Sequence, residues 1–527
     1  MSGQLPNIVN RDGIRKLTTV TFGGYRHTVG AGDGDLYDMK NMSGRYYPVL
    51  APRKKRCTVR SLTAPNGICA HDGIYTVDGT AFQKNGVTCG KVTDGAKQMV
   101  SIGSRIVIFP DKAYYDSATD TFGSLESTWN GAGKIQNGTY AEEEAAANTI
   151  YAADTDWSQY FRVGDAVTIS GCTVHPENNR TPVIREIDGA YLRFYENVFV
   201  IDEGGDIENN LTIARKVPDM DFLCENENRL WGCCGDTIYA SKLGDPFNFN
   251  VFDGLSTDSY AVGVGSAGDF TACCSYLGYP VFFKEDHIYK VYGAKPSNFQ
   301  VMRSATRGVM TGSGGSLAVA GEMLFYLSSV GIMSYSGGMP QSVHDAFGEE
   351  RYRNAVGGSD GERYYISMQD SGGRFHLFVY DTRTGLWHRE DKTHAVGFCF
   401  EGGLYCLCAD GTLFTTQEDA VGTVEETVTS MCEFADFTAG SPNHKGITKL
   451  QLRVEIEPNA VLRVEIMYDS NGIWQTVQTL AAQGKTSCYL PVIPRRCDHF
   501  RIRLSGQGEW KLYSLTCEQY IGSEHRA

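Results

Sequence analysis

The sequence has no long hydrophobic run and no excess of positive charge. None of its apolar stretches reaches the roughly 18 residues that a membrane-spanning helix needs. The N-terminal stretch MSGQLPN lacks the basic and apolar regions of a secretory signal. With 48 Lys and Arg against 62 Asp and Glu, the net charge is −14. We therefore expect no membrane span, no export signal and no wrapping of nucleic-acid phosphates by cationic side chains.

Recognisable catalytic motifs are absent too. The string at 357–361 (GGSDG) has the Gly-x-Ser-x-Gly spacing, but Ser359-Asp-Gly is interpreted as a turn between blade strands and not as a nucleophile elbow. The sequence has no His-Glu-x-x-His, no P-loop and no EF-hand loop. His287 beside Asp286, and His388 beside Trp387, fall in predicted strands and are interpreted as structural histidines. The sequence therefore predicts no catalytic, cofactor-binding or metal-binding residue, and no enzyme activity.

The 16 cysteines follow no metal-binding or disulfide pattern. Cys233-Cys234 and Cys273-Cys274 are adjacent pairs, and Cys406-x-Cys408 places two thiols on one strand face. None matches the paired CxxC spacing of a zinc site. Most have apolar neighbours, so we predict reduced core cysteines in a protein made in a cytoplasm.

What the sequence does contain is a recurring hairpin signature, together with 60 Gly, 29 Tyr and 25 Phe. An apolar run is broken by a turn and resumes with an apolar pair that usually ends in an aromatic residue. Apart from one long gap and a short last step, the copies recur every ~40–50 residues, the period of propeller blades. The seven copies are 68–75 (ICAHDGIY), 106–114 (IVIFPDKAY), 230–239 (LWGCCGDTIY), 281–289 (VFFKEDHIY), 324–333 (LFYLSSVGIM), 375–380 (FHLFVY) and 398–405 (FCFEGGLY).

The pattern predicts an all-β protein: a six- or seven-bladed β-propeller with an inserted small β-domain and a C-terminal β-sandwich. The blade number stays open because the last two copies are close together. The predicted parts are an N-terminal extended segment (1–60), blades (61–126), an inserted β-barrel or sandwich (127–216), further blades (217–419) and the C-terminal sandwich (420–527).

Local patterns support this division. In the long gap, Val163, Val167 and Ile169 alternate, and Asp188-Gly189 is a hairpin turn signal. Residues 141–148 (AEEEAAAN) are the only helix-like stretch there. In the last part, apolar and charged residues alternate strictly as in an antiparallel sheet, at 450–456, 462–466, 500–504 and 510–515.

Two N-terminal segments have more than one interpretation. Residues 17–29 alternate like a strand and could complete the last blade, which would close the ring. Residues 48–56 (PVLAPRKKR) carry four bases, either as a solvated linker or as a patch for phosphates.

Two loops resemble each other after consecutive signatures. Residues 241–249 (SKLGDPFNF) and 293–299 (GAKPSNF) both place Pro, Asn and Phe after an Ile-Tyr strand. We interpret Pro246–Phe249 and Pro296–Phe299 either as contact loops or as blade-to-blade packing, and we favour packing.

The main enzyme alternative is a carbohydrate-active propeller such as a sialidase. Asp360-Gly361 and Asp410-Gly411-Thr412 are fragments of the Asp-box turn of those enzymes, but the full pattern is missing. Glycoside hydrolysis usually needs two paired carboxylates, and the sequence offers many acids without a way to pair them.

Four phrases carry a resemblance: residues 30–42 (GAGDGDLYDMKNM), 46–53 (YYPVLAPR), 228–233 (NRLWGC) and 238–246 (IYASKLGDP). They resemble proteins from the structural gene clusters of tailed bacteriophages and prophages of Gram-positive gut bacteria. The combination is similar to the tail nozzle or tail hub proteins of short-tailed phages, over most of residues 1–420.

This resemblance implies a non-enzymatic virion tail protein, synthesised in the bacterial host cytoplasm. It implies a ring, usually of six copies, below the portal and adaptor proteins, with fibres or spikes attached. Such a nozzle retains and then conducts double-stranded DNA during ejection without binding it specifically, which suits the negative net charge. A stopper in a longer-tailed virus and a carbohydrate-binding or carbohydrate-cleaving propeller remain open, and no cofactor is implied.

Overall fold

The computed structural model describes residues 14–28, 30–32, 34–140, 143–417, 419–438, 440, 444–493 and 495–521. Over these residues the chain is built from strands. The helices among them are single 3-10 turns, and none is long and apolar enough to cross a membrane. They are η1 (Trp157–Gln159), η2 (Pro176–Asn178), η3 (Pro296–Asn298), η4 (Gly314–Ser316) and η5 (Asp345–Phe347). The chain divides into two compact units, residues 63–315 and residues 1–62 with 316–527.

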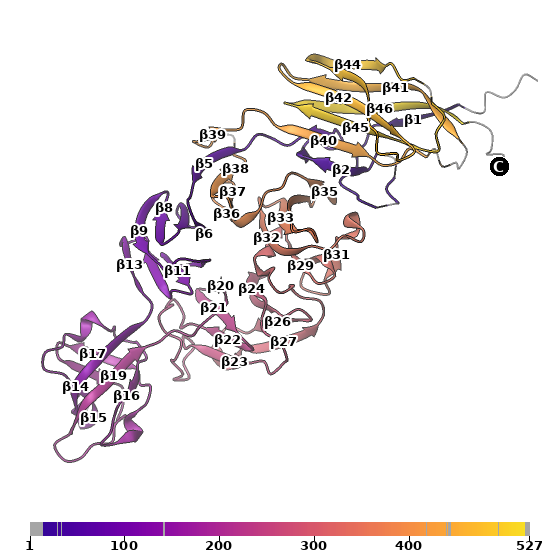
Figure 1. The fold of residues 1–527 in the computed structure, drawn as a ribbon. Coiled ribbons are helices and arrows are strands. Elements are labelled where there is room, and N and C mark those ends of the chain that lie inside the picture. The colour runs from indigo at the N-terminus through magenta and orange to yellow at the C-terminus, as the bar shows by residue number, and fades with distance from the viewer. Residues whose placement is uncertain are drawn as a thin grey trace, which may run out of the picture. The chain divides into compact units, whose positions relative to one another are not determined.

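Four antiparallel sheets of four strands, each a simple meander, recur in the unit of residues 63–315 (Figure 1). Their strands are β6 (Pro65–Ala70), β7 (Ile74–Asp78), β8 (Ala81–Lys84) and β9 (Val87–Lys91); β10 (Gln98–Ile102), β11 (Arg105–Phe109), β12 (Ala113–Asp116) and β13 (Thr121–Ser124); β20 (Phe222–Asn226), β21 (Arg229–Cys234), β22 (Thr237–Ala240) and β23 (Tyr260–Gly263); and β24 (Ala272–Tyr276), β25 (Tyr279–Phe283), β26 (His287–Tyr292) and β27 (Gln300–Ala305).

These sheets pack as propeller blades do. The first strand of each lies beside the first strand of the next, in the order β6, β10, β20, β24. Aromatic side chains fill the space between neighbouring sheets: the rings of Phe82 and Tyr115 lie 5.7 Å apart in the core between the first two. The alternating apolar residues of the hairpins therefore face neighbouring sheets rather than water.

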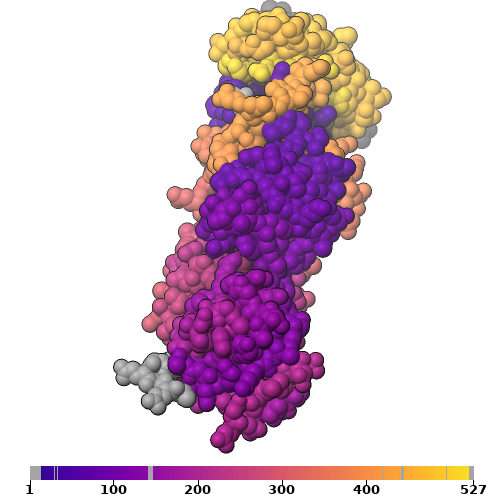
Figure 2. Space-filling model, turned by 90° about the vertical axis from the view of Figure 1, so that its left-hand side faces the viewer, coloured from indigo at the N-terminus to yellow at the C-terminus, as the bar shows by residue number. Residues whose placement is uncertain are grey.

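Between the second and third of these sheets, the chain forms a six-stranded sheet. Its strand order is β16-β19-β14-β15-β18-β17, and Figure 2 shows this region in purple and magenta next to the violet surface of the first two sheets. The strands are β14 (Ser127–Tyr140), β15 (Glu143–Tyr151), β16 (Thr168–Ser170), β17 (Ile184–Asp188), β18 (Tyr191–Phe194) and β19 (Asp206–Arg215).

Backbone hydrogen bonds between residues 164–169 and 180–184 bring the two edges of this sheet together as a barrel. Ile169 N donates to the carbonyl of Arg180 at 2.8 Å, and Val167 N to that of Pro182 at 3.1 Å. The interior holds Trp129 and Trp157, with ring centroids 4.7 Å apart, among aliphatic side chains. The Asp188-Gly189 turn joins β17 to β18 as expected.

Two local expectations for this region are wrong. Residues 141–148 were expected to be helix-like, but from Glu143 onward the chain is strand β15, paired with β14. Pairing to β14 and burial of Ala146 and Ala147 override the helix propensity of the run. Of the three alternating residues, Val167 and Ile169 are buried, whereas Val163 lies before the strand and is exposed.

The other unit contains three more sheets of the same kind. Their strands are β28 (Ala318–Ala320), β29 (Met323–Ser328), β30 (Gly331–Tyr335) and β31 (Gln341–Ser342); β32 (Arg353–Ser359), β33 (Arg363–Gln369), β34 (Phe375–Asp381) and β35 (Leu386–Arg389); and β36 (Ala395–Phe400), β37 (Leu404–Cys408) and β38 (Thr412–Thr415) with β5 (Cys57–Ser61) and β39 (Thr423–Val424).

The strand from the N-terminal part that joins this last sheet is β5, not residues 17–29, so that prediction is wrong. Thr415 pairs with Cys57 and Thr412 with Ser61, which makes β5 the fourth strand of the meander. Residues 14–19 pair instead with the last strand of the chain. Alternation of apolar and polar residues predicts a strand with one buried face. It does not show which sheet the strand joins, because the last blade-like sheet and the C-terminal sheet both bury an apolar face.

The hairpin signature marks hairpins, though not the same hairpin each time. It covers the second and third strands in the sheets that contain β11, β21, β25 and β29, and the first and second strands in the sheets that contain β6 and β36. The copy at 375–380 lies within the single strand β34. Any tight hairpin with two buried strands produces this pattern, which explains the uneven last step.

The last strands of the chain form two facing sheets with two strands from the N-terminal part (Figure 1). Trp510 on one sheet is buried and donates to Ser430 Oγ on the other at 3.0 Å. The first sheet has β1 (Ile14–Thr19), β46 (Trp510–Ile521), β41 (Lys445–Ile456) and β44 (Gln483–Leu490). The second has β2 (Leu36–Lys40), β40 (Thr429–Phe434), β45 (Phe500–Gln507), β42 (Val461–Tyr468) and β43 (Gln475–Leu480), and a short pair, β3 (Met42–Ser43) and β4 (Ala51–Pro52), follows β2.

Candidate functional site

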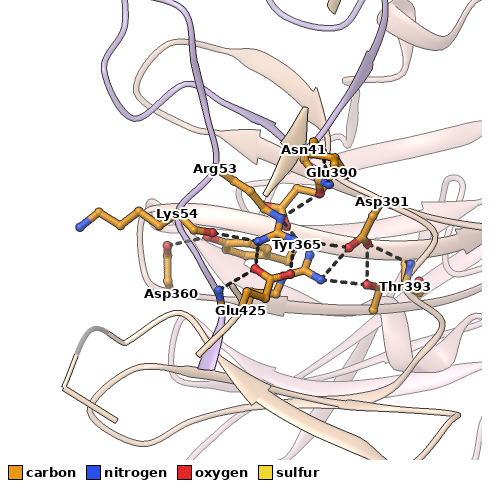
Figure 3. Close-up of polar contacts among 12 residues, drawn as sticks. Asn41, Arg53, Lys54, Asp360, Tyr365, Glu390, Asp391, Thr393 and Glu425 are labelled. Carbon is orange, nitrogen blue, oxygen red and sulfur yellow. Dashed lines mark hydrogen bonds and ion pairs between the residues drawn. The ribbon is translucent and has the colours of Figure 1, made fainter. Parts of the chain in front are cut away.

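The basic run at 48–56 lies in a buried ion-pair network (Figure 3). Arg53 and Arg56 are 6% and 7% exposed, whereas Lys55 points to solvent. The run is thus neither a solvated linker nor a patch open to phosphates, and both sequence interpretations of it are wrong. The two arginines lie between the buried strand β4 and strand β5, whose first residue, Cys57, is buried.

Three carboxylates and a buried asparagine surround the two guanidinium groups. Arg53 holds Glu425 with both Nη atoms, at 2.6 and 2.9 Å, and donates Nε to Asn41 Oδ1 at 2.9 Å. Arg56 donates to Glu390 at 2.5 Å and to Asp391 at 2.7 Å. These groups come from three separate stretches of the unit, which the network fastens together.

The charges in this network stabilise one another. Burial alone would raise the pKa of Asp391 and of Glu425, but the arginines and local hydrogen bonds lower the pKa of both carboxyls below the ordinary value. Burial alone would lower the pKa of Arg56. The charges of Glu390 and Asp391 raise this pKa by more than burial lowers it, so the net shift is upward. Carboxylates held ionised in this way cannot serve as general acids near neutral pH.

A second polar site is a cleft of about 880 Å³ in the unit of residues 63–315. Segments 180–198 of the barrel and 250–258 after β22 line it. The exposed side chains of Tyr195, Phe252 and Leu255 give it an apolar wall. Two acids, Asp253 and Asp258, stand beside this wall.

The two acids of the cleft differ in environment. Burial, then the charges of Asp258 and Glu196, raises the pKa of Asp253, and Lys242 only partly opposes this. Asp258 is buried; its Oδ2 accepts from Leu255 N at 2.9 Å, and its Oδ1 has no hydrogen-bond partner among the residues described. The cleft therefore brings together two carboxyl groups that the sequence alone could not pair.

A buried arginine supports the cleft's acidic loop. Arg229 donates to the carbonyl oxygens of Ser241 and Ser256, each at 2.7 Å, and also to that of Asp258. Arg229 thereby fixes the backbone that carries Asp258. Burial lowers the pKa of Arg229, and the charge of Asp258 opposes that shift.

The two similar loops have different environments. In Pro246–Phe249, Phe247, Asn248 and Phe249 are buried, and Asn248 bonds Asp165 at 2.9 Å and Ala166 N at 3.0 Å, which ties the barrel to the β20–β23 sheet. In Pro296–Phe299, Asn298 is exposed and caps only its own turn. The first loop is a packing loop, as favoured from sequence. In the second loop, Phe299 also packs against the preceding sheet, with its ring centroid 5.3 Å from Trp231 and 5.1 Å from Tyr260, and Asn298 stays in solvent.

His388, His287 and the cysteines have the structural surroundings that the sequence predicted. His388 is buried, and burial lowers its pKa to about 4. His287 bonds Asp286 at 2.7 Å. All 16 cysteines are free thiols, and Cys406 and Cys408 share one apolar cluster. Sequence reasoning missed the Arg53–Arg56 network and the Asp253–Asp258 pair, because neither has a conventional spacing.

No family model matches the chain, and no curated protein matches its sequence. Among solved structures it is similar to an exo-β-1,3-galactanase from Phanerochaete chrysosporium, at 8% identity over 55% of this chain and 92% of that one, with a TM-score of 0.21. It is also similar to Raptor from Chaetomium thermophilum (11% identity, 67% and 29% of the two chains, TM-score 0.28) and to a bifunctional GH43-CE protein from Bacteroides eggerthii (9% identity, 58% and 63%, TM-score 0.21). TM-scores this low assign the chain neither a family nor a function; its own sheets establish an all-β, propeller-like fold.

Proposed function

We propose that this protein is a structural subunit of a bacteriophage tail, in which the seven blade-like sheets, six of four strands and the last of five, are the blades of one propeller. Several copies would form a ring that retains and then conducts DNA and anchors fibres or spikes. The observation that carries this proposal is the structural position of the four sequence segments that resemble phage proteins. Asn41 and Arg53, from the first two phrases, are part of the buried network, and Arg229 and Asp245, from the last two, hold the loops after β22.

These phrases therefore encode structural supports of the scaffold. Arg53 joins β4 to the segment after β39, and Asp245 accepts from Asn248 at 2.7 Å within the packing loop. Substituting such residues changes the fold rather than a reaction. A resemblance that rests on structural positions supports a shared architecture, and in the tail proteins it resembles that architecture serves assembly.

The cleft favours a second candidate, a carbohydrate-binding or carbohydrate-cleaving propeller. Exposed Tyr195 and Phe252 offer surfaces on which sugar rings can stack. Asp253, with its raised pKa, is suited to donate a proton, and Asp258 is the second carboxyl group that such a reaction needs. This candidate requires both acids to touch the same substrate.

One experiment separates the two candidates. Purified protein is imaged by negative stain and weighed by native mass spectrometry, alone and with a phage portal–adaptor complex. It is then incubated with host capsule and wall polysaccharides. We expect rings whose mass is a multiple of 57.9 kDa and no cleavage. A stable monomer that cleaves polysaccharide, and loses that activity on Asp258→Asn but not on the neighbouring Ser256→Ala, would replace the tail proposal by the second candidate.

A further inference from the structure

Three side chains at one end of the barrel bring their ligand atoms together. His175, Asp202 and Asp206 each offer one atom, and all three atoms lie within 4.8 Å of one another. His175 Nε2 lies 3.4 Å from Asp202 Oδ1 and 3.7 Å from Asp206 Oδ2. These distances are longer than an ordinary hydrogen bond. They are close to the distance of about 3.4 Å that separates two ligand atoms around a tetrahedral ion with ligands at 2.0–2.2 Å.

The buried member of this group has an oxygen without a partner. Asp206 is 5% exposed, and its Oδ2, like His175 Nε2, has no hydrogen-bond partner among the residues described. Its Oδ1 accepts from Asp202 N at 3.2 Å. Glu208, two residues along the same strand, is also buried, but it accepts from Thr173 N, Val174 N and Thr173 Oγ at 2.8–2.9 Å. A buried carboxylate oxygen left over beside a histidine nitrogen is a position for a cation.

The other nitrogen of the histidine ring faces an acid. Glu177 Oε1 lies 3.6 Å from His175 Nδ1. In metal sites a carboxylate commonly accepts the second ring N–H, which leaves Nε2 free to bind the ion. No lysine or arginine in the described part of the chain pairs with Asp202 or Asp206, so their charge is left for an external cation.

The two loops that carry the ligands are already held together. Asn178 donates to the carbonyl of Val200 at 2.8 Å and accepts from Val200 N at 2.9 Å. Asn179 accepts from Cys172 N at 2.9 Å and closes the 172–179 loop. The ligands are thus preorganised, and Asp202, with its side chain 75% exposed, keeps one side open to water.

We propose that His175, Asp202 and Asp206 form a binding site for one divalent transition-metal ion of the zinc class, with solvent as the remaining ligand. One nitrogen and two carboxylate ligands suit Zn²⁺, Co²⁺ or Mn²⁺, whereas Ca²⁺ and Mg²⁺ prefer oxygen alone and more ligands. The ion fastens the 172–179 loop to the 199–206 loop. This proposal is independent of the function proposed above.

The test uses the full chain without an affinity tag, freed of metal with EDTA, and titrated with ZnCl₂ and CoCl₂ by calorimetry and absorption. We expect one ion per chain, a tetrahedral cobalt spectrum without a thiolate charge-transfer band, and no response to CaCl₂. His175→Asn and Asp206→Asn should weaken binding at least tenfold, and Glu177→Gln about tenfold.

Glu203→Gln, an exposed acid in the same loop, is the matched control and should bind as the parent protein does. Circular dichroism and native mass spectrometry of each variant establish that it is folded. The proposal is overturned by the absence of saturable binding, by a thiolate–cobalt band, or by affinities that His175→Asn and Asp206→Asn leave unchanged in folded protein.

Discussion

Two clusters of charged side chains in this chain differ in how their charges are paired. In the network of Arg53, Arg56, Glu390, Asp391 and Glu425, the chain supplies its own cations, and every acid has an arginine partner. In the cluster of His175, Asp202 and Asp206, the chain supplies two carboxylates and an imidazole, and leaves Asp206 Oδ2 without a hydrogen-bond partner among the residues described. We call the first cluster balanced because each of its three acids contacts one of its two arginines, and the second unbalanced because Asp206 Oδ2 has no hydrogen-bond partner among the residues described. The balanced cluster suits stabilisation of the fold, and the unbalanced one suits the binding of an ion, as proposed above.

The largest effect should follow from breaking the balanced cluster. Arg56→Met leaves Glu390 and Asp391 without their main cation, and removal of one partner of a buried ion pair costs ~3–5 kcal/mol. Urea unfolding of the variant should show this loss. The exposed neighbour Lys55→Met should change stability by no more than ~0.5 kcal/mol. Equal effects of the two changes would mean that the network does not stabilise the fold.

The two similar loops provide the next comparison. Asn248→Ala removes three hydrogen bonds at a buried position and should cost ~2–3 kcal/mol. Asn298→Ala removes two bonds in an exposed turn and should cost ~1 kcal/mol or less. Thermal unfolding of both variants checks the ranking. A larger loss of stability in Asn298→Ala than in Asn248→Ala would contradict this ranking of the two asparagines.

Acid should weaken the balanced cluster within a definite range. The pKa values of Asp391 and Glu425 are lower in the folded protein than in the unfolded chain, so both carboxylates stabilise the fold above their ordinary pKa values near 4. That contribution should disappear as pH falls below about 4, towards the folded pKa values. In unfolding measured from pH 7 to pH 3, Arg56→Met should show a weaker decline than the parent protein. Parallel curves would contradict this.

The smallest effect, with the opposite sign, is expected at the unbalanced cluster. In metal-free protein at pH 8, Asp206→Asn removes a buried charge that has no cation partner, so stability should be unchanged or rise by about 1 kcal/mol. Excess Zn²⁺ should stabilise the parent protein and not the variant, as differential scanning fluorimetry would record. A clear loss of stability in the metal-free variant would mean that a cationic group of the protein already compensates the charge of Asp206.

Local sequence patterns predicted many of the strands and turns of this fold. They could not predict which strands pair when those strands lie far apart in the sequence. Alternation identified β41, β42, β45 and β46, and turn chemistry identified the Asp188-Gly189 hairpin. The partner of β5 lies more than 300 positions away in the chain, and no local pattern names it. In the sequence, Arg56 is only one base in a basic run. Its partners Glu390 and Asp391 lie more than 300 positions away and contact it only in the folded chain.

The candidate sites were hidden for related reasons. His175, Asp202 and Asp206 have no conventional metal-ligand spacing, because a barrel brings its loops together by strand order rather than by interval. Asp253 and Asp258 lie five positions apart in an irregular loop, and their different environments depend on Arg229 and Glu196. A regular spacing of ligands marks sites on helices and strands. The residues of these two sites lie on loops, apart from Asp206, which is the first residue of β19.

Cryo-electron microscopy of the purified protein with its portal–adaptor complex tests the central claim most directly. We predict rings around an open channel, in which each copy shows seven blades, with β5 as the fourth strand of the last blade. A map that shows separate monomers, or polysaccharide bound between Asp253 and Asp258, would contradict the account of this chain as a tail subunit.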